Sequence, residues 1–488
     1  MRAPSDIPAR LDRLPWSRWH WRVVLALGSA WVLDGLEVTV VGSIGSVLER
    51  PDTLALDAVQ IGWMGSLYVG GAVVGALGFG RLADRLGRKR LFLVTLAVYM
   101  AATMASGLAT GYASLALFRF LTGVGIGGEY AAINSAIDEL IPARVRGQVN
   151  LAINGSFWIG AALGALLSLV LLDDRVLGPR LGWRAGFLLG AVLAIAIALV
   201  RRHVPESPRW LLAHGRGAEA ARLLDAIEAE VHAQKPEAFA AASAAPVGPN
   251  ARVVYTASVL PSLAEVGRIL WRRYPRRSAV VLTLMISQAF FYNAIFFTYA
   301  LVLTRFYGVA DARVGLYIVP FAVGNVLGPL VLGPLFDRVG RRRMIAATYA
   351  LSGVGLLLIG VGFLNAALDA WSQTLAWSAV FFIASAAASS AYLTVSEVFP
   401  LEMRALSISV FYAVGTGIGG FAAPAIFGAL IATGDRVHVF QGYVVGAVLV
   451  LAAALVAARY AVDAERRSLE DIAPPLGTAA GQADLPTP

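Results

Sequence analysis

The chain has 488 residues, of which 58% are hydrophobic and 15% are charged. This composition is too apolar for a soluble protein of that length and is typical of a polytopic membrane protein. The chain contains no cysteine, which excludes disulfides, thiolate metal sites and a cysteine nucleophile. Its formal net charge is +9. Because the arginines cluster between apolar runs, membrane topology explains this charge better than nucleic-acid binding does.

The N-terminal segment predicts a retained first span rather than a cleaved signal, since Trp16, Trp19 and Trp21 lead directly into a long apolar run. A helix needs about 20 mostly apolar residues to cross a bilayer. By this measure the sequence predicts an all-α membrane protein with twelve spans. The predicted spans are residues 22–46, 59–80, 91–109, 112–136, 149–172, 185–200, 279–304, 314–336, 343–364, 371–396, 405–433 and 439–460.

Arginine and lysine are unevenly distributed between the two sides of these spans. The short segments on the same side of the membrane as the N-terminus hold 17 of these residues, and those on the opposite side hold 7. By the positive-inside rule both termini are cytoplasmic, and we expect a multi-pass protein of the cell (inner or plasma) membrane. The predicted domains are an N-terminal six-helix bundle at 1–200, a cytoplasmic loop at 201–278, a C-terminal six-helix bundle at 279–462 and a cytoplasmic tail at 463–488.

The long loop contains EAARLLDAIEAEVHA, whose apolar residues recur at helical spacing. This pattern predicts an amphipathic helix on the cytoplasmic surface. The Ala-rich piece that follows has the composition of a linker, and the chain after Ile472 has that of a disordered tail.

Two motifs occur twice in the chain at nearly the same offset. GRLADRLGRKR (80–90) corresponds to GPLFDRVGRRR (333–343), which places Asp84 and Asp337 at matching positions. DELIPARVRG (138–147) corresponds to SEVFPLEMRA (396–405), which does the same for Glu139 and Glu397. Two six-span halves of the same topology explain this repeat, and in such proteins the substrate site lies between the halves near the middle of the membrane.

These motifs resemble the signature loops of the major facilitator superfamily across roughly residues 20–472. RFLTGVGIGGEY (119–130), PESPRWL (205–211) and RSLEDI (467–472) further resemble the sugar-porter and metabolite–proton symporter branches. The resemblance implies a transporter that moves a small molecule by alternating access, as a monomer in the lipid bilayer and without a cofactor.

The chain also departs from the sugar-porter pattern. The stretch SQAFFYN in span seven has Ser287 and Phe291 where sugar porters have glutamine and glycine, and VDAER replaces the usual Pro-Glu-Thr stretch before RSLEDI. These differences argue against a hexose substrate. GGEY in span four is closer to the metabolite–proton symporters, and DGLE (34–37) resembles the acid–glycine–x–acid signature of aromatic-acid symporters.

The repeated loops predict a cytoplasmic gate. Gly80 lets two helix ends approach closely, and Asp84 can accept hydrogen bonds from a neighbouring helix N-terminus or an arginine. By resemblance, these loops stabilise the outward-facing state by joining cytoplasmic helix ends. The alternative is that they serve topology and packing only. The predicted gate residues are Gly80, Asp84, Arg85, Arg88, Glu139, Arg146, Asp337, Arg338, Arg341, Glu397 and Arg404.

Four charged residues lie inside the predicted spans of the first half, namely Asp34, Glu37, Arg119 and Glu129. Charge at this depth is costly and usually functional. At about 1.5 Å per residue, Asp34 lies roughly 18 Å and Arg119 roughly 21 Å from the inner face, so we expect the two to pair and to couple proton uptake to transport. A permanent structural ion pair and contact with a cationic substrate are the alternatives. Glu129 is either a second proton site or a lock with a cytoplasmic arginine.

The spans of the second half offer uncharged polar and aromatic groups instead. Such groups suit a substrate site, and Gln288 and Asn293 also match sugar-porter positions by resemblance. The candidate substrate-binding residues are Gln288, Tyr292, Asn293, Tyr299, Asn325, Tyr392 and Thr394.

The sequence therefore predicts a proton-coupled symporter of a small polar metabolite, either an organic acid or a sugar-like compound. An uncoupled facilitator or a proton-antiporting exporter is the alternative within transport. A membrane sensor that binds a solute without moving it is less favoured, because the tail is short. An enzyme is least favoured, since the sequence contains no nucleophile–base or metal constellation.

Overall fold

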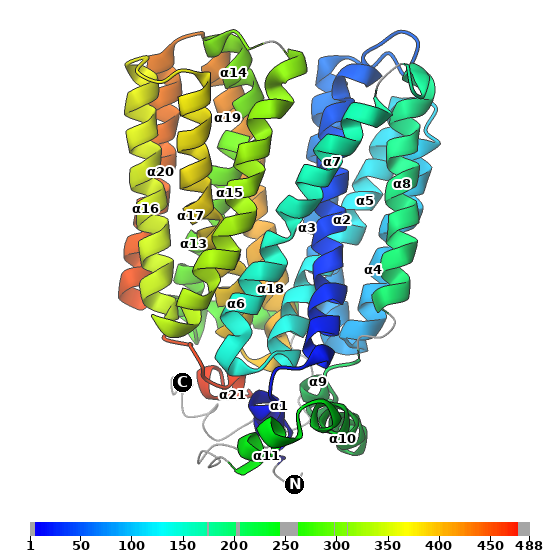
Figure 1. Cartoon of the computed structure of the whole chain (residues 1–488), viewed down its shortest axis with the longest axis vertical. Coiled ribbons are helices and arrows are strands. Elements are labelled where there is room, and N and C mark those ends of the chain that lie inside the picture. Colours follow the sequence, from blue (N-terminus) through cyan, green and yellow to red (C-terminus); the bar gives the residue numbers. More distant parts are fainter. Residues whose placement is uncertain are drawn as a thin grey trace.

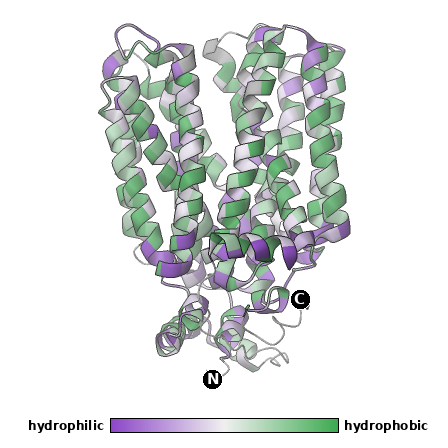
Figure 2. Ribbon diagram, turned by 180° about the vertical axis from the view of Figure 1, so that it is seen from behind, coloured by the Kyte–Doolittle hydropathy of each residue, from purple (hydrophilic) through white to green (hydrophobic). Residues whose placement is uncertain are grey.

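The computed structural model describes residues 5–172, 175–201, 205–244, 262–296, 298–309 and 311–476. Within them the chain forms two helical halves that lie side by side (Figure 1). Hydrophobic residues cover the long helices, and hydrophilic residues gather where these helices end (Figure 2). This distribution is the one expected of a bundle that crosses a bilayer.

The first half contains the six spans predicted between residues 22 and 200, and its fifth span is built from two successive helices. The sixth span begins at Gly178, earlier than predicted. The helices are α2 (Arg18–Leu48), α3 (Ala58–Leu86), α4 (Arg88–Gly107), α5 (Tyr112–Leu140), α6 (Arg146–Gly155) with α7 (Phe157–Leu171), and α8 (Gly178–Arg201).

The second half repeats this arrangement, with breaks in its first and fifth spans. The fifth contains a π-helical turn at Thr416–Gly420. The helices are α13 (Pro275–Phe296) with α14 (Tyr299–Tyr307), α15 (Asp311–Arg338), α16 (Arg341–Leu364), α17 (Ala370–Glu397), α18 (Arg404–Gly415) with α19 (Phe421–Ala432), and α20 (Arg436–Tyr460).

Of the described helices, ten are long and apolar enough to cross a membrane by length and composition alone. The two remaining predicted spans are α5 and the interrupted pair α18–α19. Helix α5 falls short because Arg119, Glu129 and several glycines lower its hydropathy. Each predicted span nevertheless corresponds to one helix or to two successive helices.

Short helices gather at one end of the bundle, which we call the base (Figure 1). The two described ends of the chain also lie there. The base helices are α1 (Ile7–Arg13), η1 (Ala143–Val145), α9 (Pro208–Ala213), α10 (Gly217–Gln234), α11 (Pro236–Ala244), α12 (Leu263–Arg272), η2 (Leu401–Met403) and α21 (Leu469–Ile472).

The amphipathic helix predicted in the long loop is α10, which buries Ala220, Leu224, Ile227 and Val231. The Ala-rich stretch after it begins as a helix, α11, rather than as the expected linker. Helix α11 buries no residue, so alanine's helix propensity rather than tertiary packing explains it. The rest of the predicted linker, at 245–261, and the predicted disordered tail from residue 477 onward lie outside the described residues.

Glycines allow pairs of helices in the first half to approach very closely. A Cβ atom built on Gly71 of α3 would lie 2.0 Å from the carbonyl oxygen of Phe120 on α5, and one built on Gly35 of α2 would lie 1.9 Å from that of Phe157 on α7. Side chains cannot fit at these positions, so the paired backbones contact each other directly, as is common between membrane helices.

This contact gives a testable prediction. Gly71→Ala should lower the stability of the folded protein by about 1–3 kcal/mol, because the added methyl group overlaps α5. Gly70→Ala is the matched control, since a Cβ on Gly70 meets no atom within 4 Å, and this change should be neutral or slightly stabilising. Thermal unfolding of the two variants in detergent measures the difference. Equal stabilities would show that the α3–α5 contact tolerates a side chain.

Candidate functional site

The carboxylate of Asp34 lies buried in the middle of α2. It accepts one hydrogen bond from the Tyr68 hydroxyl of α3 at 2.9 Å and one from the Tyr130 hydroxyl of α5 at 2.5 Å. Two neutral donors therefore satisfy this carboxylate. Both tyrosines were missed in the sequence analysis, although Tyr130 is the last residue of the GGEY stretch quoted there.

Arg119 of α5 does not pair with Asp34 as predicted. Its guanidinium forms a buried ion pair with Glu37, one helical turn further along α2. The correction follows from depth: the same rise per residue places Glu37 roughly 22 Å from the inner face, closer to the value of roughly 21 Å for Arg119. The longer glutamate side chain also reaches further across the gap between the helices.

Tyr68 connects these two groups. Its hydroxyl donates to Asp34, while its ring lies beneath the Arg119 guanidinium, with 4.5 Å between the guanidinium carbon and the ring centroid. Such a cation–π contact is attractive, and more so in a desolvated site. The acid and the arginine that the sequence analysis joined directly are thus joined through a tyrosine.

Two buried polar atoms beside the ion pair have no hydrogen-bond partner in the described part of the chain. They are the second carboxylate oxygen of Glu37 and the hydroxyl of Tyr99 on α4. The two groups are close enough to interact electrostatically. The Tyr99 hydroxyl therefore lies beside the Glu37 carboxylate.

Glu129 is also buried on α5. It lies ten residues from Arg119, or roughly 15 Å along the helix axis, so it is not a member of the Glu37–Arg119 pair. Of the four predicted coupling residues, the structure thus pairs Glu37 with Arg119 and gives Asp34 two tyrosine donors, while Glu129 lies elsewhere on α5 than Arg119.

An aromatic cluster bridges the two halves directly beside Asp34. The Tyr130 ring lies 4.6 Å from the Trp31 ring and 4.7 Å from the Tyr412 ring, measured between centroids. Tyr392 completes the cluster at 6.0 Å from Trp31. Trp31 and Tyr130 come from the first half, whereas Tyr392 and Tyr412 come from α17 and α18 of the second half. The side chain that holds Asp34 is therefore part of the interface between the halves.

Some candidate substrate-binding residues of the second half lie together at this interface. The Tyr292 hydroxyl donates to the Asn325 side chain at 2.7 Å, and the Tyr292 ring lies 5.9 Å from that of Trp158 in the first half. Gln288 lies within reach of the Tyr392 hydroxyl.

Other candidates have local partners instead. The Asn293 amide donates to the Ala289 carbonyl and the Thr394 hydroxyl to the Ser390 carbonyl, each within its own helix. The buried Tyr299 hydroxyl is bonded to Thr374. These three side chains thus form hydrogen bonds to neighbours in the second half. Gln288, Tyr292, Asn325 and Tyr392, by contrast, lie at the centre.

At the base, each half contains the same three-residue ion network. In the first half Arg88 binds Glu139 at 2.8 Å and Asp84 at 3.4 Å. In the second half Arg341 binds Glu397 at 3.0 Å and Asp337 at 2.8 Å. All six side chains are buried. The duplicated motifs therefore form duplicated structures.

The two aspartates of these networks join one half to the other. Asp84 accepts a hydrogen bond from the backbone N–H of Leu406, in the first turn of α18, at 3.1 Å. Asp337 accepts from the backbone N–H groups of Gly147 and Gln148, in the first turn of α6, at 3.2 and 2.7 Å. Each carboxylate thus caps the positive end of a helix in the opposite half.

Reciprocal arginines strengthen the same interface. Arg146 lies 3.9 Å from Glu397, and Arg404 lies 3.9 Å from Glu139, each pair crossing between the halves. Gly80 contributes by close approach, because a Cβ built on it would lie 2.0 Å from the hydroxyl of Ser409. Arg85 and Arg338, also predicted as gate residues, point away: both are exposed.

Glu206 and Glu465 occupy equivalent places in the two halves. Glu206 accepts hydrogen bonds from the backbone N–H groups of Arg88 and Lys89 at the start of α4, and Glu465 accepts one from that of Arg341 at the start of α16. Burial raises the pKa of Glu206, while the N–H groups around it act in the opposite direction. The sequence analysis quoted PESPRWL but did not assign its glutamate.

Asp12 and Arg209 tie the base helices to this network. Asp12 of α1 binds Arg146 at 3.1 Å and Arg209 of α9 at 2.7 Å. Arg209 also binds Glu470 of α21 at 3.0 Å and donates to the Glu139 carbonyl at 2.8 Å. A single buried guanidinium therefore connects segments from the start, the middle and the end of the described chain.

The sequence matches the family of sugar (and other) transporters over residues 18–474. The chain belongs to this family. The niacin transporter NiaP of Acinetobacter baylyi is 29% identical over 471 residues, which cover 96% of this chain and 99% of that protein. The 4-hydroxybenzoate transporter PcaK of the same organism is 27% identical over 431 residues, 88% of each chain. The solved structure of the proton:xylose symporter XylE bound to 6-bromo-6-deoxy-D-glucose has a TM-score of 0.76 at 18% identity and covers 93% of this chain and 98% of that one.

These findings confirm the predicted major facilitator fold with its twelve spans in two six-helix halves. They also confirm that this member of the sugar (and other) transporter family is a transporter and not an enzyme. As a transporter it takes a small-molecule substrate and is a multi-pass membrane protein.

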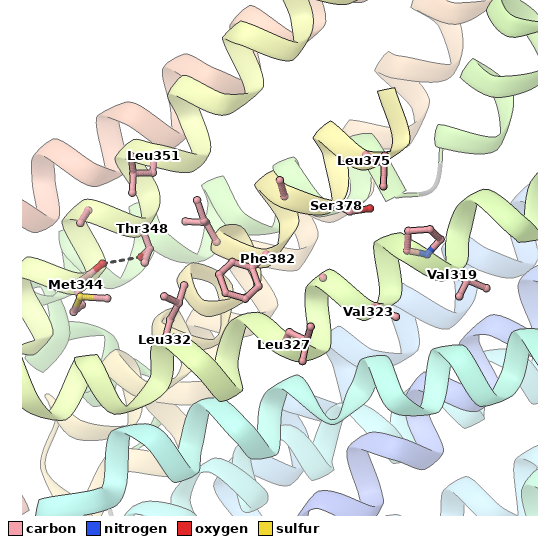
Figure 3. Close-up of a pocket in the computed structure, with 15 residues that line it drawn as sticks. Val319, Val323, Leu327, Leu332, Met344, Thr348, Leu351, Leu375, Ser378 and Phe382 are labelled. Carbon is pink, nitrogen blue, oxygen red and sulfur yellow. Dashed lines mark hydrogen bonds between the residues drawn. The ribbon is translucent and has the colours of Figure 1, made fainter. Parts of the chain in front are cut away.

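A large pocket on the transporter lies away from the centre. It has a volume of about 990 Å³ and is lined by apolar side chains of α15, α16 and α17, among them Leu327, Leu351 and Phe382 (Figure 3). The hydroxyls of Thr348 and Ser378 in its wall donate to carbonyls of their own helices. Because Leu327 and Leu351 are on the outer surface, this pocket faces the lipid and offers no polar group to a polar substrate.

The caps at the base give a prediction that exploits the absence of cysteine. In a Ser409→Cys background, Asp84→Asn should speed maleimide labelling of the new cysteine roughly tenfold, because a charge-assisted bond to Leu406 is weakened and the base opens more often. Arg85→Gln is the matched control and should label at the parent rate. If Asp84→Asn labels as slowly as the parent, this aspartate does not hold the base closed.

Proposed function

We propose that the chain is a proton-coupled symporter of a small aromatic carboxylate and that the structure represents its outward-facing state. The observation that carries the proposal is the Asp34 group, in which a buried acid is held by Tyr68 and Tyr130 beneath an aromatic cluster that spans both halves. The proposal keeps the four domains predicted from the sequence and places the base on the cytoplasmic side of the membrane.

The coupling follows from electrostatics. Within the described part of the chain, no cation contacts the buried carboxylate of Asp34 directly, because Glu37 takes Arg119. A substrate carboxylate that enters beside it brings a second negative charge into a medium of low dielectric constant. The two carboxyl groups can share the site only if a proton accompanies them. Substrate and proton therefore assist each other's binding, which is the thermodynamic condition for symport.

The aromatic cluster supports an aromatic ring as the rest of the substrate. Trp31, Tyr130, Tyr392 and Tyr412 present ring faces and edges from both halves, and a planar ring can pack among them in an offset or edge-to-face arrangement. The relatives named for niacin and 4-hydroxybenzoate transport are consistent with this class. Because the cluster contains residues from both halves, a bound ring would respond to their relative movement.

The base networks provide the cytoplasmic gate in this proposal. Reorientation to the inward-facing state requires Asp84 and Asp337 to leave the helix ends that they cap. The two halves would then rock around the central site.

An uncoupled facilitator is the second candidate. It is favoured by the fact that Arg119 already has a buried partner in Glu37, so that this ion pair can be a permanent structural element that does not respond to Asp34.

Replacement of Asp34 separates the two candidates. In proteoliposomes with an inward proton gradient and labelled niacin as the probe, Asp34→Asn should abolish accumulation, because the site can no longer take up a proton with the substrate. Counterflow exchange should remain, since the asparagine still accepts a hydrogen bond from a tyrosine. Binding should also lose its dependence on pH, which in the parent reaches at most about tenfold per pH unit. Uptake by the parent that does not respond to the proton gradient would favour the facilitator, whereas undiminished accumulation in Asp34→Asn would assign proton coupling to another residue.

The substrate class has its own test. Trp31→Ala should raise the KM for niacin or 4-hydroxybenzoate roughly three- to tenfold, because it removes one ring contact from the cluster. Trp31→Phe keeps an aromatic ring there, so its KM should stay close to that of the parent. Trp63→Ala is the control, as Trp63 lies exposed on α3. An unchanged KM in Trp31→Ala would exclude the cluster as the binding site for the ring.

A further inference from the structure

Three arginines of the second half converge on one pocket at the base. Arg276 lies at the start of α13, Arg342 at the start of α16 and Arg459 near the end of α20. The pocket has a volume of about 540 Å³, and Leu455, Ala458 and Tyr460 complete its lining. Arg342 is held in place by a hydrogen bond of 2.7 Å to the carbonyl of Ala458, so the pocket is built across the α16–α20 contact.

The charge of this pocket is not neutralised within the described part of the chain. Arg276, Arg342 and Arg459 form no ion pair there, whereas the neighbouring Arg341 is held by Asp337 and Glu397. None of the described residues that line the pocket is acidic. Three cations that share one concave site repel one another and create a strong positive electrostatic potential there. The site therefore favours an anion with several acceptor oxygens, such as a phosphate group.

The other wall of the pocket is apolar and leads toward the hydrocarbon region. Leu455 lies one turn before Arg459 on α20 and is 72% exposed. Val448 lies seven residues before Leu455, on the same face of the helix, and is 59% exposed. Tyr460, 45% exposed, lies at the helix end, where tyrosines mark the membrane interface. An apolar strip thus continues from the arginines into the membrane.

We propose that this pocket binds an anionic phospholipid, with the phosphate on the three arginines and an acyl chain along Leu455 and Val448. The strip on α20 favours a lipid over a free phosphate, which would use only the arginines. Basic pockets between membrane helices on the cytoplasmic side are suited to such headgroups. The lipid would bridge α13, α16 and α20 and stabilise the second half.

The test compares two double variants of the full chain. Arg342→Gln with Arg459→Gln removes two charges from the pocket. Arg272→Gln with Arg343→Gln removes two exposed arginines at the same end of the bundle that do not line it. Each protein is incubated with vesicles of phosphatidylcholine that contain a minor fraction of phosphatidylglycerol, and the retained phosphatidylglycerol is counted by native mass spectrometry. The pocket variant should lose roughly fivefold in relative affinity per arginine, and the control should match the parent.

Further measurements identify the source of the anion and show whether the variants are folded. Thermal stability should rise with phosphatidylglycerol in the parent and not in the pocket variant, and Arg342→Lys with Arg459→Lys should keep most of the effect because the charge remains. Equal losses in the pocket variant and the control would overturn the proposal, since general surface charge would then explain binding. Competition by soluble glycerol phosphate as strong as by the lipid would also overturn it, because the site would then hold a free anion.

Discussion

A guanidinium buried in a membrane protein must meet carboxylates or carbonyl groups, because an unpaired charge in a medium of low dielectric constant is prohibitively costly. This constraint organises the whole base of the molecule. Arg88, Arg146, Arg341 and Arg404 are all buried there, and their partners come from other helices and in part from the opposite half. Arg88 and Arg341 are thus paired within their own halves, while Arg146 and Arg404 approach carboxylates of the opposite half.

Duplication explains why the base is symmetric, while the centre is not. Asp84 of the first half caps a helix of the second half, and Asp337 of the second half caps a helix of the first. In the middle of the bundle, by contrast, the first half carries Asp34 and the Glu37–Arg119 pair, and the second half contributes neutral groups such as Tyr392. The two halves share the same ion network at the base, but the charged groups described at the centre come from the first half.

The sequence predicts the parts of this structure that depend on regular patterns. Hydropathy locates the spans, and the offset between Asp84 and Asp337 reveals the duplication. Partner choice depends on finer geometry: one helical turn decides whether Arg119 meets Asp34 or Glu37. Tyr68 was missed because a single tyrosine in a span has no periodic signal. The backbone caps were expected only in general terms, because the helix that each aspartate caps lies in the other half and is set by tertiary structure.

The position of Arg209 has a consequence for how the protein is made. This guanidinium is satisfied by Asp12, by the Glu139 carbonyl and by Glu470, and the last of these leaves the ribosome hundreds of residues after the first. Until then the cation lacks one of its two carboxylates, and Asp84 lacks the Leu406 N–H. A first bundle inserted ahead of the second therefore lacks these two contacts, which form only after the C-terminal segment has been made.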